Sequence, residues 1–147
     1  MNRDISPGLF DRVLSNKALL GAGLLVARLF MAAVFIRFGI GKIIHRPQMQ
    51  LYMEAHGVPS ELIYLTIVVQ LGFGLMVVLG YQTRFAALML AGFCVIATLL
   101  FHTDFSVQGE ETNFYKDFAI AGGFLFMIAA GPGPFSIDDF RKRLITD

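Results

Sequence analysis

A few basic, imidazole and amide side chains stand out in a chain that is otherwise 56% hydrophobic. They lie where long apolar stretches begin or end, and their N–H groups could hold an anion or polarise a carbonyl oxygen. A simpler interpretation is that the lysines among them are anchors, which reach from helix ends to a membrane surface. Spacing alone leaves both interpretations open for this set, which is Lys42, His45, His102, Asn113 and Lys116.

Several other chemistries lack the residues that they need. Cys94 is the only cysteine, so an internal dithiol–disulfide exchange is excluded. The three histidines have no metal-ligand spacing, and no carboxylate stands beside them at helical offsets, so we predict no metal site. The net charge of +1 argues against nucleic acid as the main partner. We also expect no covalently bound cofactor.

Four apolar runs must position the polar side chains. They cover residues 18–38, 62–79, 85–101 and 118–131, and the first three have 21, 18 and 17 residues. A helix needs about 20 residues to cross the hydrocarbon core of a bilayer, and these runs are too long for barrel strands. The fourth run has 14 residues and reaches spanning length if its helix begins near Asn113. The sequence therefore predicts an all-α integral membrane protein with a four-helix bundle at residues 18–131.

The distribution of Lys and Arg predicts the orientation of this bundle. Seven of these residues lie in the N-terminal segment, the second link and the C-terminal segment, whereas three lie in the first and third links. Because cytoplasmic loops carry an excess of Lys and Arg, we expect both termini in the cytoplasm. Residues 1–17 are then a cytoplasmic interfacial segment, for which a frayed tail is the alternative. Residues 132–147 are a short polar cytoplasmic tail.

The first two links between the runs have structure of their own. Pro47 suits the first turn of a helix, and the sequence Gly57-Val58-Pro59 ends it. We therefore expect a short interfacial helix, on the outer membrane surface, between the first two membrane helices. Residues 80–84 predict a tight turn, which makes the second and third helices an antiparallel hairpin.

Two arginines lie within the first apolar run. At 100° per residue, Arg28 and Arg37 point about 180° apart on a helix. An arginine at a helix centre costs about 2.5–3.5 kcal/mol on insertion scales, so at least one must find a partner or escape the hydrocarbon. We expect Arg37 to reach lipid or the outer interface. Arg28 should face the bundle at mid-membrane depth, within hydrogen-bond reach of Gln70 or a backbone carbonyl.

Helical phase and topology together gather polar groups at one end of the bundle. Lys42, His102, Asn113 and Lys116 fall where helices meet the outer surface, each on the small or polar stripe of its helix. We therefore expect these four to converge on one pocket that opens to the outer leaflet. Surface anchors would instead point to separate sides of the bundle.

Several short motifs follow one another along the chain. They are Phe-Gly-Ile-Gly-Lys at residues 38–42, Val-Gln-Leu-Gly at 69–72, Leu-Gly-Tyr-Gln-Thr-Arg at 79–84, Asn-Phe-Tyr-Lys at 113–116 and Gly-Pro-Gly at 131–133. In this order they resemble the DoxX family of small bacterial inner-membrane proteins. The resemblance runs from about Leu24 to Asp138 and implies a bacterial inner-membrane protein with four helices.

The resemblance also implies which residues form a ligand-binding site. Gln70 stands where relatives usually carry Glu, and a neutral amide neither accepts a proton nor balances a cation. A family mechanism that needs this acid is therefore in doubt here. The family's recurring polar positions map to Arg28, Lys42, His102, Asn113 and Lys116.

Two functions follow from the resemblance. One branch of the family, DoxD, is a subunit of a thiosulfate:quinone oxidoreductase, and another member is linked to a redox complex with a thiosulfate sulfurtransferase and a superoxide dismutase. This implies a redox-linked membrane subunit that binds a quinone or a small sulfur oxyanion and has redox proteins as partners. The alternative is a non-catalytic scaffold or assembly protein. The sequence leaves open whether the chain is an enzyme and whether it forms a homo-oligomer.

Overall fold

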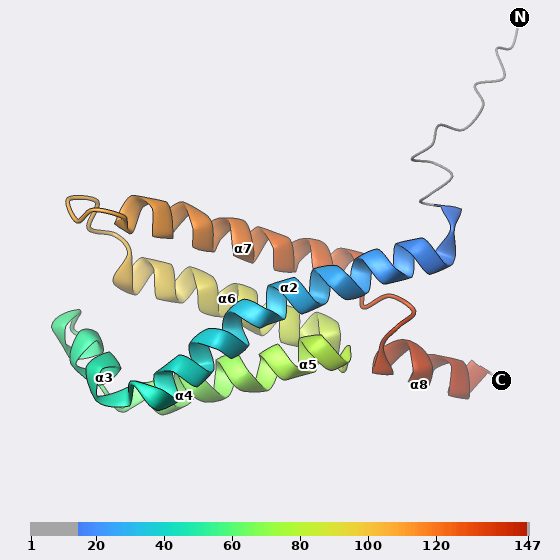
Figure 1. Ribbon diagram of the computed structural model, residues 1–147, viewed down its shortest axis with the longest axis horizontal. Coiled ribbons are helices and arrows are strands. Elements are labelled where there is room, and N and C mark those ends of the chain that lie inside the picture. The colour runs from blue at the N-terminus through green and yellow to red at the C-terminus, as the bar shows by residue number, and fades with distance from the viewer. Residues whose placement is uncertain (1–14, 147) are drawn as a thin grey trace, which may run out of the picture.

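The computed structural model describes residues 15–146, and within this range every regular element is a helix. Long helices lie side by side, with the short helices α3 and α8 at opposite ends of the molecule (Figure 1). We call these ends the α3 end and the α8 end. The elements are α2 (Lys17–Ile44), α3 (Arg46–Ala55), α4 (Leu62–Val68), the π-helical turn η1 (Val69–Phe73), α5 (Gly74–Leu79), α6 (Thr83–Phe101), α7 (Glu110–Ala130) and α8 (Ile137–Thr146).

Three of the helices are long and apolar enough to cross a membrane, namely Lys17–Ile44, Leu62–Leu79 and Thr83–Phe101. Only 22% to 33% of the most apolar window of each is buried inside the protein, so most of that surface faces outward. Side chains as large as Phe30 and Phe126 are 75% and 80% exposed. A soluble protein rarely exposes apolar surface on this scale, which suits contact with lipid. The chain is therefore an all-helical membrane protein.

The start of α2 follows from a cap. The side-chain oxygen of Asn16 accepts hydrogen bonds from the backbone N–H groups of Ala18 and Leu19, at 3.0 and 3.3 Å, and so satisfies donors that a helix start leaves unpaired. Of the interfacial segment predicted for residues 1–17, only residues 15–17 lie within the described part of the chain. Lys17 already belongs to α2.

The helices pack around aromatic and small residues. Phe35 makes edge-to-face contacts with Phe93 and Phe124, with ring centroids 6.4 and 5.3 Å apart. Gly39 lets α2 approach η1 closely, because a Cβ atom at this position would lie 2.7 Å from Leu71 Cδ2. This contact helps to set the register of α2, that is, which of its residues lie beside η1.

The helix predicted at residues 62–79 contains an irregular turn that its sequence pattern does not indicate. η1 has π-helical hydrogen bonding between the α-helical segments α4 and α5. Such wide turns are frequent at functional sites. Gln70 lies on η1, is buried, and its side-chain oxygen has no hydrogen-bond partner among residues 15–146.

Two links match their predictions. α3 carries its proline at the start, and a turn at Gly57, where φ is +72°, follows its end. Met53 of α3 is buried against Val58 and Ile63. The hairpin turn ends where α6 begins at Thr83. The position of α3 on the outer membrane surface stays a prediction.

The start of the last long helix and the C-terminal tail differ from their predictions. α7 begins at Glu110 rather than near Asn113, because Gly109 takes the N-cap position and two glutamates in the first turn favour a helix start. The tail, predicted as a short polar segment, contains the helix α8. Acidic residues in its first turn and a basic residue in its last turn stabilise it.

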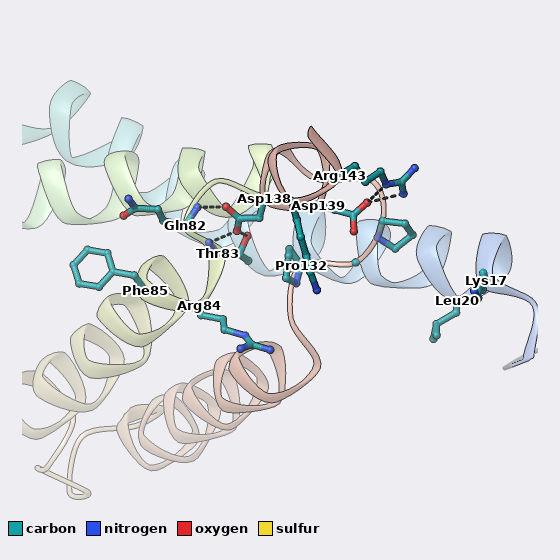
Figure 2. A pocket seen from close by; sticks show the side chains of 13 residues that line it. Lys17, Leu20, Gln82, Thr83, Arg84, Phe85, Pro132, Asp138, Asp139 and Arg143 are labelled. Carbon is teal, nitrogen blue, oxygen red and sulfur yellow. Dashed lines mark hydrogen bonds and ion pairs between the residues drawn. The ribbon is translucent and has the colours of Figure 1, made fainter. Parts of the chain in front are cut away.

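α8 is fastened to the hairpin turn by Asp138. The carboxylate accepts hydrogen bonds from the backbone N–H of Gln82 at 2.8 Å and from the N–H and hydroxyl of Thr83, both at 2.9 Å (Figure 2). The Asp138 N–H donates to the Gly80 carbonyl at 2.9 Å. Asp138 therefore serves as the missing cap of α6 and positions α8 beside it.

Candidate functional site

Arg28 is buried at the α8 end and joins α2 to the link after α7. Its two terminal nitrogens donate to the backbone carbonyls of Pro132 and Phe135, each at 2.6 Å. The expectation that Arg28 is buried and bonded to a backbone carbonyl is confirmed. Its guanidinium lies against Gly80 at the end of the hairpin rather than midway along the helices, and its depth in the membrane stays a prediction.

Gln70 is not the partner of Arg28. It packs beside Gly39, which is 11 residues further along α2, or about 16 Å at the helical rise. Arg37, on the opposite side of α2 from Arg28, is exposed as expected. The prediction that Arg28 faces inward and Arg37 faces outward is thus confirmed. The hydrogen bond expected between Arg28 and Gln70 is not formed.

Lys42 lies apart from the other predicted pocket residues. It is half-buried and lines a groove of 400 Å³ at the α3 end, which Arg37, His45 and Met49 also line. His102, Asn113 and Lys116 are not among the lining residues of this groove. Lys42 therefore lines a groove to which the other three do not contribute, and the convergence of all four on one pocket stays a prediction.

His102 faces two carboxylates between α6 and α7 at the α3 end. Its Nδ1 pairs with Glu110, and its Nε2 lies 3.9 Å from an Asp117 oxygen. Thr98, one turn before His102 on α6, donates its hydroxyl to the same Asp117 carboxylate at 3.3 Å. The three charged or titratable side chains are each about a fifth exposed. These side chains are therefore mostly buried, but part of each can still be reached by a ligand from outside the protein.

Asn113 belongs to the same face of α7, because it lies three residues after Glu110 and four before Asp117. The ammonium of Lys116 donates to the side-chain oxygen of Asn113 at 2.7 Å. The structure therefore brings three of the predicted residues, His102, Asn113 and Lys116, to one end of the α6–α7 pair. We call Thr98, His102, Glu110, Asn113 and Asp117 the acid–base cluster.

Aromatic side chains adjoin the acid–base cluster. Tyr52 of α3 stacks on Phe101 with a centroid separation of 5.5 Å, and His56 lies edge-on to Phe101 at 5.4 Å. Burial raises the pKa of Tyr52, and the negative charge of Glu110 raises it further. Tyr52 is therefore close enough to Glu110 to interact with its charge. α3 thus places flat rings next to the cluster.

Sequence reasoning missed the carboxylates of this cluster. Both carboxylates lie in residues 102–117, between the third and fourth apolar runs, and neither is among the predicted site residues. A helical signal was present, since Glu110, Asn113 and Asp117 are spaced as i, i+3 and i+7. The consequence is chemical, because a site expected to be cationic is an imidazole between two acids. Among residues 15–146, no group of three or more His, Cys, Asp or Glu side chains is placed to hold a metal ion.

Comparison with known proteins identifies the family. The DoxX family model matches residues 23–103, which is more than half of the chain. The chain belongs to the DoxX family. The matched region of this DoxX protein contains Arg28, Lys42, Gln70, Thr98 and His102, and it ends before α7.

Two relatives in Escherichia coli (strain K12) are inner membrane proteins. YqjF is 43% identical over 127 residues, which cover 86% of this chain and 98% of YqjF. YphA is 29% identical over 122 residues, which cover 78% of this chain and 87% of YphA. The Surfeit locus protein 4 homolog of Schizosaccharomyces pombe is 31% identical over 74 residues, 46% of this chain and 24% of that protein. No solved structure matches the chain.

Proposed function

We propose that α7 is a fourth crossing, so that this DoxX protein spans the bacterial inner membrane four times with both termini in the cytoplasm. Support comes from the packing of α7 along α6 and from the start of α2 and the end of α8, which lie at the same end (Figure 1). The Lys and Arg distribution supports the cytoplasmic orientation. Reporter fusions after Asp147 and within residues 108–111 should report opposite sides of the membrane. An external C-terminal fusion would contradict this orientation.

We also propose that the protein is a membrane subunit of a redox system and that its acid–base cluster binds the head group of a quinone. The observation that carries this proposal is the position of His102 between Glu110 and Asp117 at the end of membrane helices. Reduction and reoxidation of a quinone transfer protons together with electrons. Imidazole is the side chain that exchanges protons near neutral pH, and carboxylates can pass those protons on.

The donors and acceptors present fit a quinone head group. The amide of Asn113 and the ammonium of Lys116 can donate to a quinone carbonyl. With Nδ1–H donating to Glu110, His102 keeps a lone pair on Nε2 for the hydroxyl of the reduced form. The ring faces of Tyr52 and Phe101 supply a stacking surface.

A sulfur oxyanion fits this cluster less well than a quinone. Two carboxylates flank His102, and like charges repel an incoming anion in a shielded site. A partner protein must donate the two electrons that reduce a quinone, or accept the two that a quinol releases, since the single cysteine, Cys94, cannot cycle through an internal disulfide. The proposal therefore assigns this chain the binding and proton exchange of a quinone, and assigns electron transfer to a redox partner.

The experiment compares two neighbouring glutamates. Glu110→Gln removes the acid that pairs with His102 and keeps the side-chain shape, whereas Glu111→Gln changes an exposed residue of the same helical turn. In Glu110→Gln the carboxylate no longer holds the His102 proton on Nδ1, so Nε2 is less available to accept from the hydroxyl of the reduced ligand, and we expect decylubiquinol to bind about tenfold more weakly. Glu111→Gln should bind like the natural protein. The measurement is the ligand-dependent rise in melting temperature in detergent.

Quinone retained from native membranes provides a second readout. The natural protein and Glu111→Gln should carry quinone after purification, and Glu110→Gln and His102→Gln should lose most of it. If no form retains or binds quinone, the scaffold interpretation replaces this proposal. Equal binding by all four forms would show that the ligand lies elsewhere.

A further inference from the structure

A groove at the α8 end lies far from the acid–base cluster and is not used by the proposed function. Its volume is 780 Å³, and it is bounded by the start of α2, the start of α6, the link after α7, and α8. Figure 2 shows Lys17 and Leu20 on one side, with Arg84 and Phe85 on another. Proline and glycine residues of the α7–α8 link also line it.

The lining of the groove is positively charged on balance. It contains four Lys and Arg side chains and two carboxylates, which leaves a net charge of two positive units. Both oxygens of Asp138 accept hydrogen bonds from the start of α6. Asp139 forms an ion pair with Arg143 at 2.6 Å. The carboxylates therefore have their own partners within the protein.

Arg84 has no such carboxylate. Among residues 15–146 it makes no ion pair or side-chain hydrogen bond, and its guanidinium lies beside Gly131, where α7 ends. Figure 2 shows the side chain reaching from the start of α6 towards that end of α7. Lys17 is likewise without an ion pair in the described part of the chain. Two cations thus border one groove without an internal counter-charge.

We infer the depth of the groove from the level at which the hairpin of spanning helices ends, and place it in the lipid head-group layer. Arg28 of α2 lies level with Gly80, where the hairpin of two spanning helices ends. α2 begins 11 residues before Arg28, at Lys17, so it projects about 16 Å beyond that level. The hydrocarbon core ends where helices of spanning length end, and the head groups begin there. The projecting part of α2 forms one wall of the groove.

The helix that forms the opposite wall is suited to a membrane surface. Ile137, Phe140 and Leu144 fall on one side of α8, and all three are exposed. Basic residues Arg141, Lys142 and Arg143 lie between them in sequence. An amphipathic helix with Lys and Arg beside an apolar face binds anionic interfaces. Asp138 holds this helix against the hairpin, so its orientation is fixed relative to the groove.

We propose that this groove binds the phosphate of an anionic phospholipid from the leaflet at the α8 end. Arg84 would contact the phosphate, because it lies at the level where the hairpin ends, and Lys17, farther out along α2, would attract the anionic head group from the rim of the groove. The apolar side chain of Phe85, the next residue of α6, would contact the start of the acyl chains. A free phosphate would use the same cations but would gain nothing from this apolar contact.

The test measures lipid preference with the full chain in detergent. Fluorescently labelled phosphatidylglycerol is titrated against labelled phosphatidylcholine, and energy transfer to the labelled protein reports binding. Each Lys or Arg near an anionic surface contributes about fivefold to such a preference. Lys17→Gln with Arg84→Gln should therefore reduce the preference for phosphatidylglycerol by about 25-fold. The matched control is Arg37→Gln with Arg46→Gln, which removes two exposed cations from the α3 side of the molecule and should leave the preference unchanged.

A single variant and a competition with inorganic phosphate test the site further. Lys17→Gln alone changes an exposed residue at the projecting start of α2, so it should fold normally and lose about fivefold. Unchanged preference in both Lys17→Gln and the double variant would overturn the proposal. Displacement of labelled lipid by millimolar inorganic phosphate would assign the site to a free anion and overturn the lipid assignment. If the control variant loses as much preference for phosphatidylglycerol, the effect comes from net charge and the groove is not the binding site.

Discussion

Arg28→Met should lower the free energy of unfolding by about 3–5 kcal/mol, because it removes two hydrogen bonds from a charged group, each of which contributes about 1.5–3 kcal/mol. The substitution keeps an unbranched side chain but leaves the Pro132 and Phe135 carbonyls without their donor. Both carbonyls belong to the link that carries α8, so α8 should also detach more readily. The measurement is the melting temperature in detergent, combined with proteolysis of the C-terminal segment.

Arg37→Met is the matched control for this prediction. It removes the same charge from the same helix at an exposed position. We expect a change of no more than about 0.5 kcal/mol, because exposed positions away from special contacts tolerate substitution. Equal stability of the two variants would show that the hydrogen bonds of Arg28 contribute nothing net. A greater loss in Arg37→Met would contradict the facing of α2.

The helices could be predicted because lipid imposes a length and an internal hydrogen-bond requirement on every crossing segment. The same periodicity gave the opposite faces of Arg28 and Arg37. It could not give the level of Arg28 along the helices, since that level depends on how far α2 is shifted along its neighbours. That shift is fixed by contacts distant in sequence, such as Gly39 against Leu71.

The candidate site was predicted in part for a related reason. Helical phase placed His102 and Asn113 on inward faces, and the structure brings them to the same end of α6 and α7. The radial position of Lys42 depends on α3, which forms a separate groove with it. Glu110 and Asp117 were missed because their charge suggested a link. In the structure Gly109 is the N-cap of α7, so both residues belong to the helix and their spacing places them on one of its faces.

α8 shows how a short segment gains structure from its surroundings. Ten residues are too few for a stable isolated helix in water. Asp138 accepts hydrogen bonds from the start of α6, and Arg141 lies over the ring of Tyr81 at 5.9 Å from its centroid. These contacts are tertiary, so composition alone suggested a polar tail. They also bring α8, Arg28 and the hairpin turn together around Gly80.

Gly80→Ala should be among the most destabilising single substitutions in the chain, with a loss of about 2–5 kcal/mol from backbone strain and overpacking. Gly80 has φ of +68°, a left-handed conformation that disfavours a Cβ atom. The added Cβ would also lie 2.5 Å from Arg28 Nη1 and 2.9 Å from the Cα of Ser136. Because Ser136 is approached at its backbone, the α7–α8 link must move and the Arg28 hydrogen bonds must lengthen.

Two other glycines separate the causes of this loss. Gly57 has φ of +72° but nothing within 4 Å of an added Cβ, so Gly57→Ala should cost only the conformational part, about 1–2 kcal/mol. Gly92 lies within α6 with open space around it. Gly92→Ala should therefore stabilise the protein by about 0.5–1 kcal/mol. Melting temperatures in one detergent should fall in the order Gly92→Ala, natural protein, Gly57→Ala, Gly80→Ala. If Gly80→Ala melts with Gly57→Ala, the close packing of Arg28 and Ser136 against the hairpin turn is absent.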